Sequence, residues 1–365
     1  MKNFGFGAMR LPVLDKEDGT KVDLEQVNKM ADAFLEAGFT YFDTAYMYHG
    51  GFSERAMKSC VIERHDRSSF TLADKMPIMH VHGPEDYPKF FDEQLSRTGA
   101  GYFDYYLLHA MNAQRYEECM KWGAFDFVAE KKKQGLIKHA GFSFHDSADV
   151  LDKILTEHPE VEFVQLQLNY LDWDSAVVQS GACYEVAVNH NVPIVVMEPV
   201  KGGTLANLPE GAVKLLKENG MNDSPATYAL RFCMSLPGVM VVLSGMSNME
   251  QALDNCQTLK DCEPLTAEEK QTLAKVANII NSGYVIPCTR CGYCMEVCPI
   301  GMPIPSLMGL YNNFAVSGNM SKNYLARITY GHNVPSACLG CQACEGNCPQ
   351  HIEITKYLNE IAKYE

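Results

Sequence analysis

The sequence contains no run of about 18 consecutive apolar residues, so it predicts no membrane-spanning helix. Its first residues, Met1-Lys2-Asn3-Phe4-Gly5, lack the apolar core of a secretory signal, and we therefore expect a cytoplasmic protein. Basic residues are few, because 31 Lys and Arg face 45 Asp and Glu for a formal net charge of −14. A chain this acidic is not expected to bind nucleic acid or an anionic membrane surface.

Two cofactor motifs are also absent. The stretch Gly5-Phe6-Gly7 begins like a dinucleotide-binding fingerprint, but the third glycine of that fingerprint would fall on Arg10, and no helix follows. We interpret it as a strand and a turn. The sequence has no flavin motif and no low-complexity tract, and its one internal repeat is a duplicated cysteine pattern.

The composition is otherwise that of a folded protein, with 47% hydrophobic and 21% charged residues. A chain of 365 residues exceeds an average domain but fits one large barrel followed by a small module. The 14 cysteines are unusual, because eight of them crowd into two short arrays near the C-terminus. Without an export signal, such arrays indicate metal ligands rather than disulfides. The other six, which we expect to be ordinary buried thiols, are Cys60, Cys119, Cys183, Cys233, Cys256 and Cys262.

Strand-like and helix-like segments alternate through most of the chain. The strand candidates are Phe4–Arg10, Thr40–Ala45, Phe70–Lys75, Tyr102–His109, Ala140–Phe144, Phe163–Asn169, Pro193–Pro199 and Val239–Ser244. The helical patterns are Leu24–Ala37, Ser53–Arg64, Pro84–Ser96, Tyr116–Gln134, Ala148–Glu157, Ser175–His190, Ser224–Ser235 and Met249–Asn255. Eight such units in about 255 residues predict an α/β fold of the (β/α)₈ TIM-barrel type. A doubly wound sheet is the rival, but it seldom uses eight such regular units.

Further helices are predicted after the barrel, at Thr266–Asn281, Pro303–Phe314 and Ser321–Thr329. We therefore predict three parts. They are a TIM barrel over residues 1–260, a connecting helix over residues 261–284, and a small α-helical domain that carries the cysteine arrays over residues 285–365.

Polar residues at the predicted strand ends are informative, because the active site of such a barrel lies at the carboxyl ends of its strands. Strand two ends near Asp43 with Tyr48 on its loop, strand three ends at Lys75, and strand four ends at His109. A lysine ammonium next to a tyrosine lowers the tyrosine pKa from about 10, and a carboxylate keeps the lysine charged. A neutral imidazole can position a carbonyl. The set is suited to protonating an oxygen as hydride reaches its carbon, and the alternative is a buried ion pair with a core histidine.

The strand-end residues resemble the aldo-keto reductase family from Phe4 to about Asn255. The residues that carry the resemblance are Asp43, Tyr48, Lys75 and His109, with Gly141-Phe142-Ser143 after strand five. The resemblance implies that Tyr48 is the acid/base and that His109 orients a carbonyl. It also implies that Asp43 and Lys75 tune Tyr48, and that the cofactor is NADPH or NADH.

The resemblance also implies a set of cofactor contacts, among which Ser143 and Gln165 meet the nicotinamide carboxamide. The other implied contacts are Met197, Lys201, Gly202, Ser244, Gly245, Asn248, Gln251 and Asn255. The chain departs from the family pattern at four positions: Phe144 replaces an asparagine, Met197 replaces a stacking aromatic, and Gly245 and Gln251 replace two cations for the 2′-phosphate. Losing both cations weakens the expectation of NADP over NAD.

The residues of the segment Lys201-Gly202-Gly203 alone support two interpretations. It can offer a positive charge and backbone N–H groups to a pyrophosphate. It can equally form a simple glycine turn with a solvated lysine.

The two cysteine arrays have the same spacing, x₂-x₂-x₃, and each ends in Cys-Pro. This is the bacterial ferredoxin run, and it predicts two [4Fe–4S] clusters. Zinc is the alternative and fits poorly, because zinc sites usually use cysteine pairs separated by longer loops. The resemblance to ferredoxins implies that each array gives its fourth thiolate to the other cluster. The ligand sets are then Cys288, Cys291, Cys294 and Cys348 for one cluster, and Cys338, Cys341, Cys344 and Cys298 for the other.

The sequence thus resembles an aldo-keto reductase barrel fused to a C-terminal ferredoxin-type domain of the α-helical kind. It implies an oxidoreductase that reduces a small aldehyde or ketone to an alcohol, with hydride from NAD(P)H and a proton from Tyr48. The clusters indicate an oxygen-poor cytoplasm, as in an anaerobe. One alternative is a reductase fed through its clusters by a ferredoxin- or flavodoxin-type partner. The other is a non-enzymatic electron-transfer or redox-sensing protein.

Overall fold

The computed structural model describes residues 4–15, 18–175, 178–283, 285–286, 288, 292–348 and 350–365. The chain divides into two compact units. The first unit comprises Met1–Trp173, Ser180–Ala206 and Asp223–Ala267, and the second comprises Asp174–Gln179, Asn207–Asn222 and Glu268–Glu365. The boundaries drawn from the sequence at residues 260 and 284 stay a prediction.

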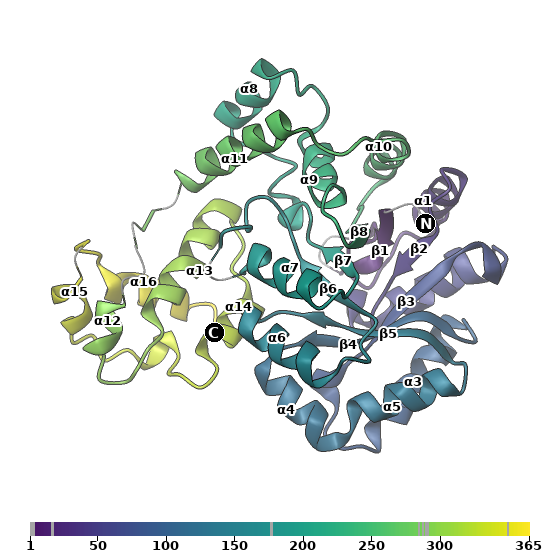
Figure 1. Cartoon of the computed structure of the whole chain (residues 1–365), viewed down its shortest axis with the longest axis horizontal. Coiled ribbons are helices and arrows are strands. Elements are labelled where there is room, and N and C mark those ends of the chain that lie inside the picture. The colour runs from purple at the N-terminus through teal and green to yellow at the C-terminus, as the bar shows by residue number, and fades with distance from the viewer. Residues whose placement is uncertain are drawn as a thin grey trace. The chain divides into compact units, whose positions relative to one another are not determined.

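The first unit is built on a closed barrel of eight parallel strands in sequential order, with β1 paired to β8 (Figure 1). The strands are β1 (Phe4–Gly7), β2 (Tyr41–Asp43), β3 (Thr71–Met76), β4 (Phe103–Met111), β5 (Ile137–Phe144), β6 (Phe163–Gln167), β7 (Ile194–Met197) and β8 (Val239–Ser244). All eight overlap the segments predicted from the sequence. The TIM barrel is therefore confirmed, and the closed sheet rules out the doubly wound alternative.

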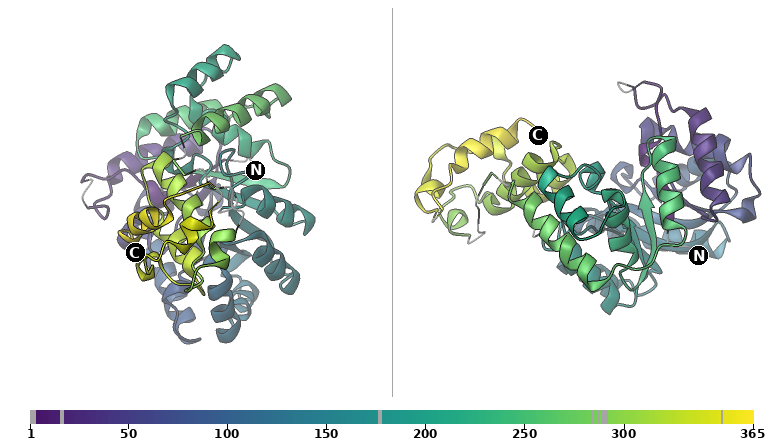
Figure 2. Two further views of the ribbon diagram at one scale, coloured as in Figure 1. Left: turned by 90° about the vertical axis from the view of Figure 1, so that its left-hand side faces the viewer. Right: turned by 90° about the horizontal axis from the view of Figure 1, so that it is seen from above.

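Helices surround the barrel, as Figure 2 shows from two further directions. They are α1 (Leu24–Glu36), α2 (Ser53–Met57), α3 (Asp86–Thr98), α4 (Ala113–Trp122), α5 (Ala124–Lys133), α6 (Ala148–Glu157), α7 (Ser180–Asn189), α9 (Pro225–Met234) and α10 (Met249–Leu259). Their starts follow ordinary capping chemistry: the Ser224 side chain accepts a hydrogen bond from the backbone N–H of Thr227, and Pro225 occupies the first turn of α9.

Two helix predictions were wrong. The predicted helix Tyr116–Gln134 is two helices, α4 and α5, because Gly123 between them has φ +73° and ends α4 in a left-handed conformation. The helix predicted from Ser175 begins at Ser180 instead. The second unit also contains α8 (Glu210–Glu218), which the sequence analysis missed, and α11 (Ala267–Asn281).

The interior of the barrel is filled by the inward-facing half of the strand residues, since side chains alternate along a strand. They form one buried cluster of Tyr41, Ala73, Tyr105, Leu107, Phe163, Val195, Val241 and Leu243. Glycines make room for the rings: a Cβ at Gly5 would lie 2.7 Å from Val241, and a Cβ at Gly141 would lie 2.2 Å from the carbonyl oxygen of Phe163. This packing closes the floor of the barrel beneath the residues at the strand ends.

The cysteine-rich part of the second unit has its own apolar core, in which Leu307, Met308 and Leu358 are buried. Its helices are α12 (Tyr293–Glu296), α13 (Ile304–Ser317), α14 (Lys322–Thr329), α15 (Ala343–Gly346) and α16 (Ile354–Ala362). This confirms the predicted helical character of the C-terminal region. Helix α16 and the two short helices were not predicted.

The backbone of this region repeats after 50 residues. Helices α12 and α15 begin 50 positions apart, and so do α13 and α16. Left-handed backbone recurs at Gly292 (φ +85°) and Gln342 (φ +60°), and again at Gly301 (φ +63°) and His351 (φ +50°). The duplicated cysteine pattern is therefore a duplicated backbone.

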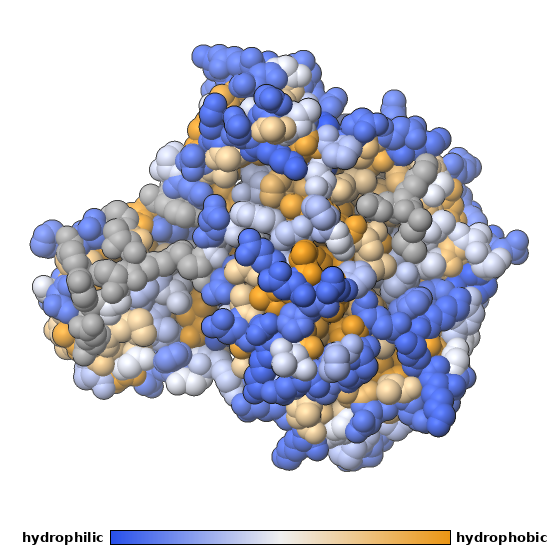
Figure 3. Space-filling model, viewed as in Figure 1, coloured by the Kyte–Doolittle hydropathy of each residue, from blue (hydrophilic) through white to orange (hydrophobic). Residues whose placement is uncertain are grey.

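None of the described helices is long and apolar enough to cross a membrane. On the face drawn in Figure 3, hydrophilic residues dominate the surface of the barrel helices, and hydrophobic residues show mainly between them. Of the six scattered cysteines, five are buried and Cys262 is half-buried, as expected for ordinary thiols.

Replacing Gly141 by alanine tests the packing of the barrel floor. Because the new Cβ would overlap the backbone of β6, we expect Gly141→Ala to lower the free energy of unfolding by about 1–3 kcal/mol or more. Gly19→Ala is the matched control, because no atom lies within 4 Å of its Cβ position. Circular dichroism during urea unfolding measures both, and equal stability of the two variants would contradict the packing described here.

Candidate functional site

Four ionisable side chains meet at the carboxyl ends of β2, β3 and β4. The ammonium of Lys75 lies among them, with its Nζ 2.5 Å from Asp43 Oδ1, 2.7 Å from the carbonyl oxygen of Thr44 and 3.4 Å from the hydroxyl of Tyr48. The ring of His109 packs edge-on against the ring of Tyr48, with 5.9 Å between the ring centroids. The structure thus brings together the four residues that the strand ends singled out.

The register of the barrel explains this convergence. Asp43, Lys75 and His109 each stand two positions after a residue of the inner cluster, so their side chains point into the barrel as well. All parallel strands end at the same rim, which places the three groups side by side. Tyr48 comes from the short 3₁₀ turn Tyr48–Gly51 on the loop after β2.

His49, next to Tyr48, fixes this loop. Its Nε2 accepts a hydrogen bond of 3.0 Å from the backbone N–H of Leu11, and its Nδ1 lies 2.7 Å from the carbonyl oxygen of Gly19. The imidazole therefore ties the β2 loop to the β1 loop. Its backbone is left-handed, with φ +52°, which is uncommon for a residue other than glycine.

Burial sets the protonation of the tyrosine. It raises the pKa of Tyr48 above the ordinary value, and the nearby charge of Lys75 only partly opposes this effect. The predicted net lowering of the Tyr48 pKa is therefore wrong: the desolvation of an enclosed phenol outweighs one adjacent ammonium.

The charges of Lys75 and Asp43 depend on each other. Burial lowers the pKa of Lys75, but Asp43 and Tyr48 outweigh this effect, so the pKa is raised and the lysine stays an ammonium. Burial raises the pKa of Asp43, and Lys75 offsets part of that rise. The two opposite charges thus stabilise each other in a place where neither is solvated.

His109 is neutral. Burial holds the pKa of its imidazole well below the ordinary range, and the positive charge of Lys75 acts in the same direction. Its Nδ1 is buried and has no hydrogen-bond partner among the described residues. A neutral imidazole next to Tyr48 can donate one N–H to an oxygen atom in the open end of the barrel.

Ser143 and Gln165 face each other on the paired strands β5 and β6. The Ser143 hydroxyl oxygen accepts a hydrogen bond of 2.7 Å from the backbone N–H of Ala110, which leaves its hydrogen free to be donated. Gln165 lies with its Nε2 3.4 Å from Asp43 Oδ2, and its buried Oε1 has no partner among the described residues. One donor and one orphaned acceptor side by side complement a primary amide, so these two residues fit the nicotinamide carboxamide.

Lys201, predicted to face the cofactor, forms an ion pair with Asp172 on the β7 side of the barrel end. Both side chains are largely buried, and Asp172 also accepts hydrogen bonds of 3.1 Å from Gln167 and 2.9 Å from Asn169. Lys201 is therefore neither the solvated lysine of a plain turn nor an unpaired cation. Gly202 beside it is left-handed, with φ +63°.

The predicted contacts after β8 bond mainly to one another. Asn248 caps α10 by accepting a hydrogen bond from Gln251 N, and the Gln251 side chain accepts one of 2.8 Å from the backbone N–H of Ser247. Asn255 donates a hydrogen bond of 3.2 Å to the hydroxyl of Ser244. Met197, at the end of β7, is half-buried, and Gly245 directly follows β8.

Sequence reasoning missed two residues at this end of the barrel. Arg10 lies against Gly202 and Gly245, and Glu198 follows β7 with an exposed side chain and a left-handed backbone (φ +52°). Arg10 ends the predicted first strand, so the strand-end rule that found Lys75 would also have found it. Strained backbone away from glycine tends to gather at functional sites.

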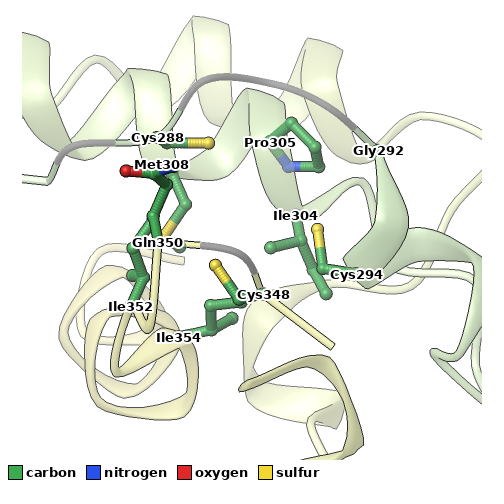
Figure 4. Close-up of a pocket in the computed structure, with 10 residues that line it drawn as sticks. All are labelled: Cys288, Gly292, Cys294, Ile304, Pro305, Met308, Cys348, Gln350, Ile352 and Ile354. Carbon is green, nitrogen blue, oxygen red and sulfur yellow. The ribbon is translucent and has the colours of Figure 1, made fainter. Parts of the chain in front are cut away.

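The second unit contains two cavities lined by cysteines. One holds about 340 Å³ of empty space, which includes space open to solvent, and is lined by Cys288, Cys294 and Cys348, whose sulfur atoms face the same space in Figure 4. The other holds about 330 Å³ of empty space, measured in the same way, and is lined by Cys298, Cys338, Cys341 and Cys344. Cys291, predicted for the first set, lies outside the described residues. Each cavity takes thiols from both copies of the repeat.

The rest of each lining is mainly apolar, with Ile304 shared by both cavities, Met308 in one and Leu358 in the other. Among the described residues, no three His, Cys, Asp or Glu side chains lie close enough together to hold one metal ion. The thiols therefore surround a space instead of converging on a point. This arrangement fits a [4Fe–4S] cluster, in which thiolates bind different irons, better than a tetrahedral zinc ion.

Comparisons with known proteins cover both parts of the chain. The model of the aldo/keto reductase family matches residues 3–278, and the model of the 4Fe-4S dicluster domain matches residues 287–353. The chain is 24% identical over 274 residues to the uncharacterized oxidoreductase YqkF of Bacillus subtilis, an alignment of 66% of this chain and 84% of that protein.

A second relative matches a shorter part of the chain. It is subunit alpha 1 of the acetyl-CoA decarbonylase/synthase complex of Methanosarcina acetivorans, 32% identical over 80 residues. That alignment covers 22% of this chain and only 8% of the subunit.

Two solved structures share the barrel. The holo form of aldo-keto reductase AKR11C1 from Bacillus halodurans has a TM-score of 0.59 and 26% identity over 75% of this chain and 91% of its own. An aldo-keto reductase from Klebsiella pneumoniae in complex with NADPH has a TM-score of 0.59 and 20% identity over 75% and 90% of the two chains. At that identity, the second likeness shows the fold alone.

The mutual dependence of Lys75 and Asp43 can be tested by replacing one and then both. Lys75→Met leaves a buried carboxylate without its partner, so we expect the free energy of unfolding to fall by about 3–5 kcal/mol. Adding Asp43→Asn removes that charge and should recover part of the loss. Urea unfolding of the single and double variants measures this, and a double variant no more stable than Lys75→Met would contradict the pairing.

Proposed function

Because the chain belongs to the aldo/keto reductase family, we propose that it reduces an aldehyde or ketone to an alcohol with NADPH or NADH. The observation that carries this proposal is the position of the Lys75 ammonium between Asp43 and Tyr48, with neutral His109 beside them. This set can hold a carbonyl oxygen and give it a proton, which is the half of the reaction that the protein itself supplies.

Each residue of the set has one role. Reduced nicotinamide, when bound, supplies hydride to the carbonyl carbon. Tyr48 donates its phenolic proton to the carbonyl oxygen, and the ammonium of Lys75, 3.4 Å away, stabilises the phenolate that remains. His109 donates a hydrogen bond to the same oxygen and orients it, and Asp43 keeps Lys75 charged. A proton from solvent restores Tyr48.

Ser143 and Gln165 hold the nicotinamide in this proposal. Ser143 donates its hydroxyl hydrogen to the carboxamide oxygen, and Gln165 accepts from the carboxamide nitrogen. The orphaned Oε1 of Gln165 supports this role, because a buried acceptor without a partner costs about 1–3 kcal/mol unless a ligand satisfies it.

For the second unit, we propose two [4Fe–4S] clusters. The ligand sets are Cys288, Cys291, Cys294 and Cys348 for one, and Cys298, Cys338, Cys341 and Cys344 for the other. The two thiol-lined cavities and the match to a dicluster domain support these sets. When bound, the clusters exchange single electrons, and a ferredoxin- or flavodoxin-type protein is the partner suited to them.

A second candidate function is a reductase fed by its clusters without nicotinamide. The observation that favours it is that Lys201 and the side chains of Asn248 and Gln251 are engaged within the protein. Turnover with reduced ferredoxin, in a protein that binds neither NADH nor NADPH, would replace the first proposal with this one. Tyr48 would supply the proton in either case.

Tyr48→Phe tests the proton donor. Because phenylalanine has no proton to give, we expect kcat for carbonyl reduction to fall by about 10²–10⁴, with binding of the nicotinamide unchanged within about threefold. Tyr46→Phe is the matched control: Tyr46 lies on the same loop with its hydroxyl 3.0 Å from Glu93, away from the set. Oxidation of NADPH with a panel of aldehydes and ketones measures both, and full activity of Tyr48→Phe would refute the assignment.

Pairs of cysteine substitutions test the exchange of ligands between the arrays. Cys288→Ala with Cys348→Ala affects one proposed cluster, so the iron content should fall from about eight to about four per chain. Cys288→Ala with Cys298→Ala affects both clusters, so nearly all iron should be lost. Iron and sulfide analysis after anaerobic purification gives the counts. The reverse order would show that each array binds its own cluster.

A further inference from the structure

Two buried acids lie behind Lys75, on the outer face of β3. Asp74 stands between Ala73 and Lys75, which face the barrel interior, so its side chain points outward to the helices. There it meets Glu54 of α2, and both acids are 0% exposed. Neither carboxyl group takes part in the proposed reaction. Two buried acids in contact are costly unless something neutralises one of them.

The hydrogen bonds of this carboxyl pair leave a place for one proton. Asp74 Oδ1 accepts from the backbone N–H of Lys75 at 2.8 Å, and Glu54 Oε2 accepts from Nη1 of Arg97 at 2.9 Å. The second arm of Arg97 pairs with Glu93 at 2.5 Å. The remaining oxygens, Asp74 Oδ2 and Glu54 Oε1, meet no donor among the described residues. The two carboxyl groups are within hydrogen-bonding reach of each other, so a single proton would join them.

The surrounding charges place this proton on Asp74. Burial raises the pKa of both acids, but the charge of Arg97 opposes the rise at Glu54. The negative charge of Glu54 raises the pKa of Asp74 further, and Lys75 offsets only part of this. Tyr106 on β4 also faces the pair and stays neutral, because burial and the two acids hold its pKa well above the ordinary value.

The carboxyl pair holds the backbone of Lys75 where the sheet does not. Strand β2 ends at Asp43, opposite Ala73, so Lys75 extends beyond this neighbouring strand. Its backbone N–H donates to Asp74 instead, and its carbonyl oxygen accepts a hydrogen bond of 3.0 Å from Nε2 of Gln94 on α3. Side chains from outside the barrel therefore replace the missing strand at this point.

Glu54 connects the same point to the loop of Tyr48. It lies in the first turn of α2, which begins two residues after the 3₁₀ turn Tyr48–Gly51. Arg97, its partner, also lies with its guanidinium carbon 4.1 Å from the ring centre of Tyr46 on that loop. The carboxyl pair thus joins the end of β3 to the loop after β2. The distance of 3.4 Å between Lys75 Nζ and the Tyr48 hydroxyl depends on how these two segments lie.

We propose that Asp74 and Glu54 share one proton and position Lys75 against Tyr48 from outside the barrel. The catalytic consequence rests on the proposed function, whereas the shared proton does not. The two acids touch neither substrate nor cofactor in this scheme, so they are positioning residues. The proton also matters for charge: an ionised Asp74 would raise the pKa of Tyr48 further, and Tyr48 is the proton donor.

Infrared spectroscopy of the full chain with its clusters tests the shared proton. Asp74→Asn has the shape of a protonated aspartate, with an oxygen to accept from Lys75 and an N–H to donate to Glu54. At neutral pH, we expect the unchanged protein to show a protonated-carboxyl C=O band that Asp74→Asn lacks. Asp92→Asn, at an exposed position of α3, is the matched control and should keep the band. A band of equal size in Asp74→Asn would overturn the shared proton.

The pH dependence of stability counts the proton. An aspartate in the unfolded chain loses its proton near pH 4, whereas Asp74 keeps it in the folded protein. The unchanged protein should therefore lose stability relative to Asp74→Asn as the pH rises from about 5, until Asp74 ionises in the fold. One bound proton changes the ratio of the two unfolding constants about tenfold per pH unit. Urea unfolding at several pH values measures this ratio, and a constant ratio would contradict the proposal.

Asp74→Ala tests the positioning, because it releases both Lys75 and Glu54. Amide hydrogen exchange in residues 44–57 should become faster in this variant and stay unchanged in Asp74→Asn. For carbonyl reduction, kcat should fall by about ten- to a hundredfold with Kd for NADPH unchanged within about threefold, and Asp74→Asn should restore it. If Asp74→Ala does not fold, Gln94→Ala, which releases the Lys75 carbonyl, takes its place with the same expectations.

The outcomes separate this inference from the proposed function. If the unchanged protein reduces no carbonyl, the proposed function falls, while the infrared band and the hydrogen exchange still decide on the carboxyl pair. If exchange and kcat of Asp74→Ala equal those of the unchanged protein, the positioning role is refuted and the proposed function stands.

Discussion

Lys75 and Asp43 carry opposite charges inside a barrel whose floor is closed by aromatic and aliphatic side chains. Each charge would be costly there alone, and each is stabilised by the other at 2.5 Å. This pairing fixes the position of the ammonium at the strand ends. The charge of the ammonium in turn affects the pKa of the Tyr48 hydroxyl and the pKa of the His109 imidazole. Burial sets the direction of the pKa shift at both groups, and the ammonium held by this contact opposes the shift at Tyr48 and adds to the shift at His109.

Much of the fold was predictable because the barrel repeats one simple rule. Eight short β-favouring runs at regular spacing predicted the strands and their order. Helix starts such as Ser224–Pro225 could be predicted from the capping residues themselves. Local residues also misled. The helical sequence pattern runs on across Gly123, although this left-handed glycine separates two helices. Helix α8 was missed because no strand directly follows it, so it does not belong to a regular strand–helix unit.

Some features of the candidate site could also be predicted from the sequence, and others could not. Asp43, Lys75 and His109 could be predicted to converge, because parallel strands of a closed barrel must end at one rim. The pKa of Tyr48 could not, since it depends on how completely the phenol is enclosed. Neither could the pairing of Lys201 with Asp172 or the reach of Arg10 over Gly245, because each joins loops that are far apart in the sequence.

The two copies of the repeat in the second unit differ in backbone strain. At the two left-handed positions, the first copy has Gly292 and Gly301, while the second copy has Gln342 and His351. A left-handed residue other than glycine costs roughly 1–2 kcal/mol, so the second copy carries strain that the first does not. The two copies are thus alike in backbone but unequal in backbone strain, and Gln342, one of the strained residues, lines a cavity that Cys298 of the first copy also lines.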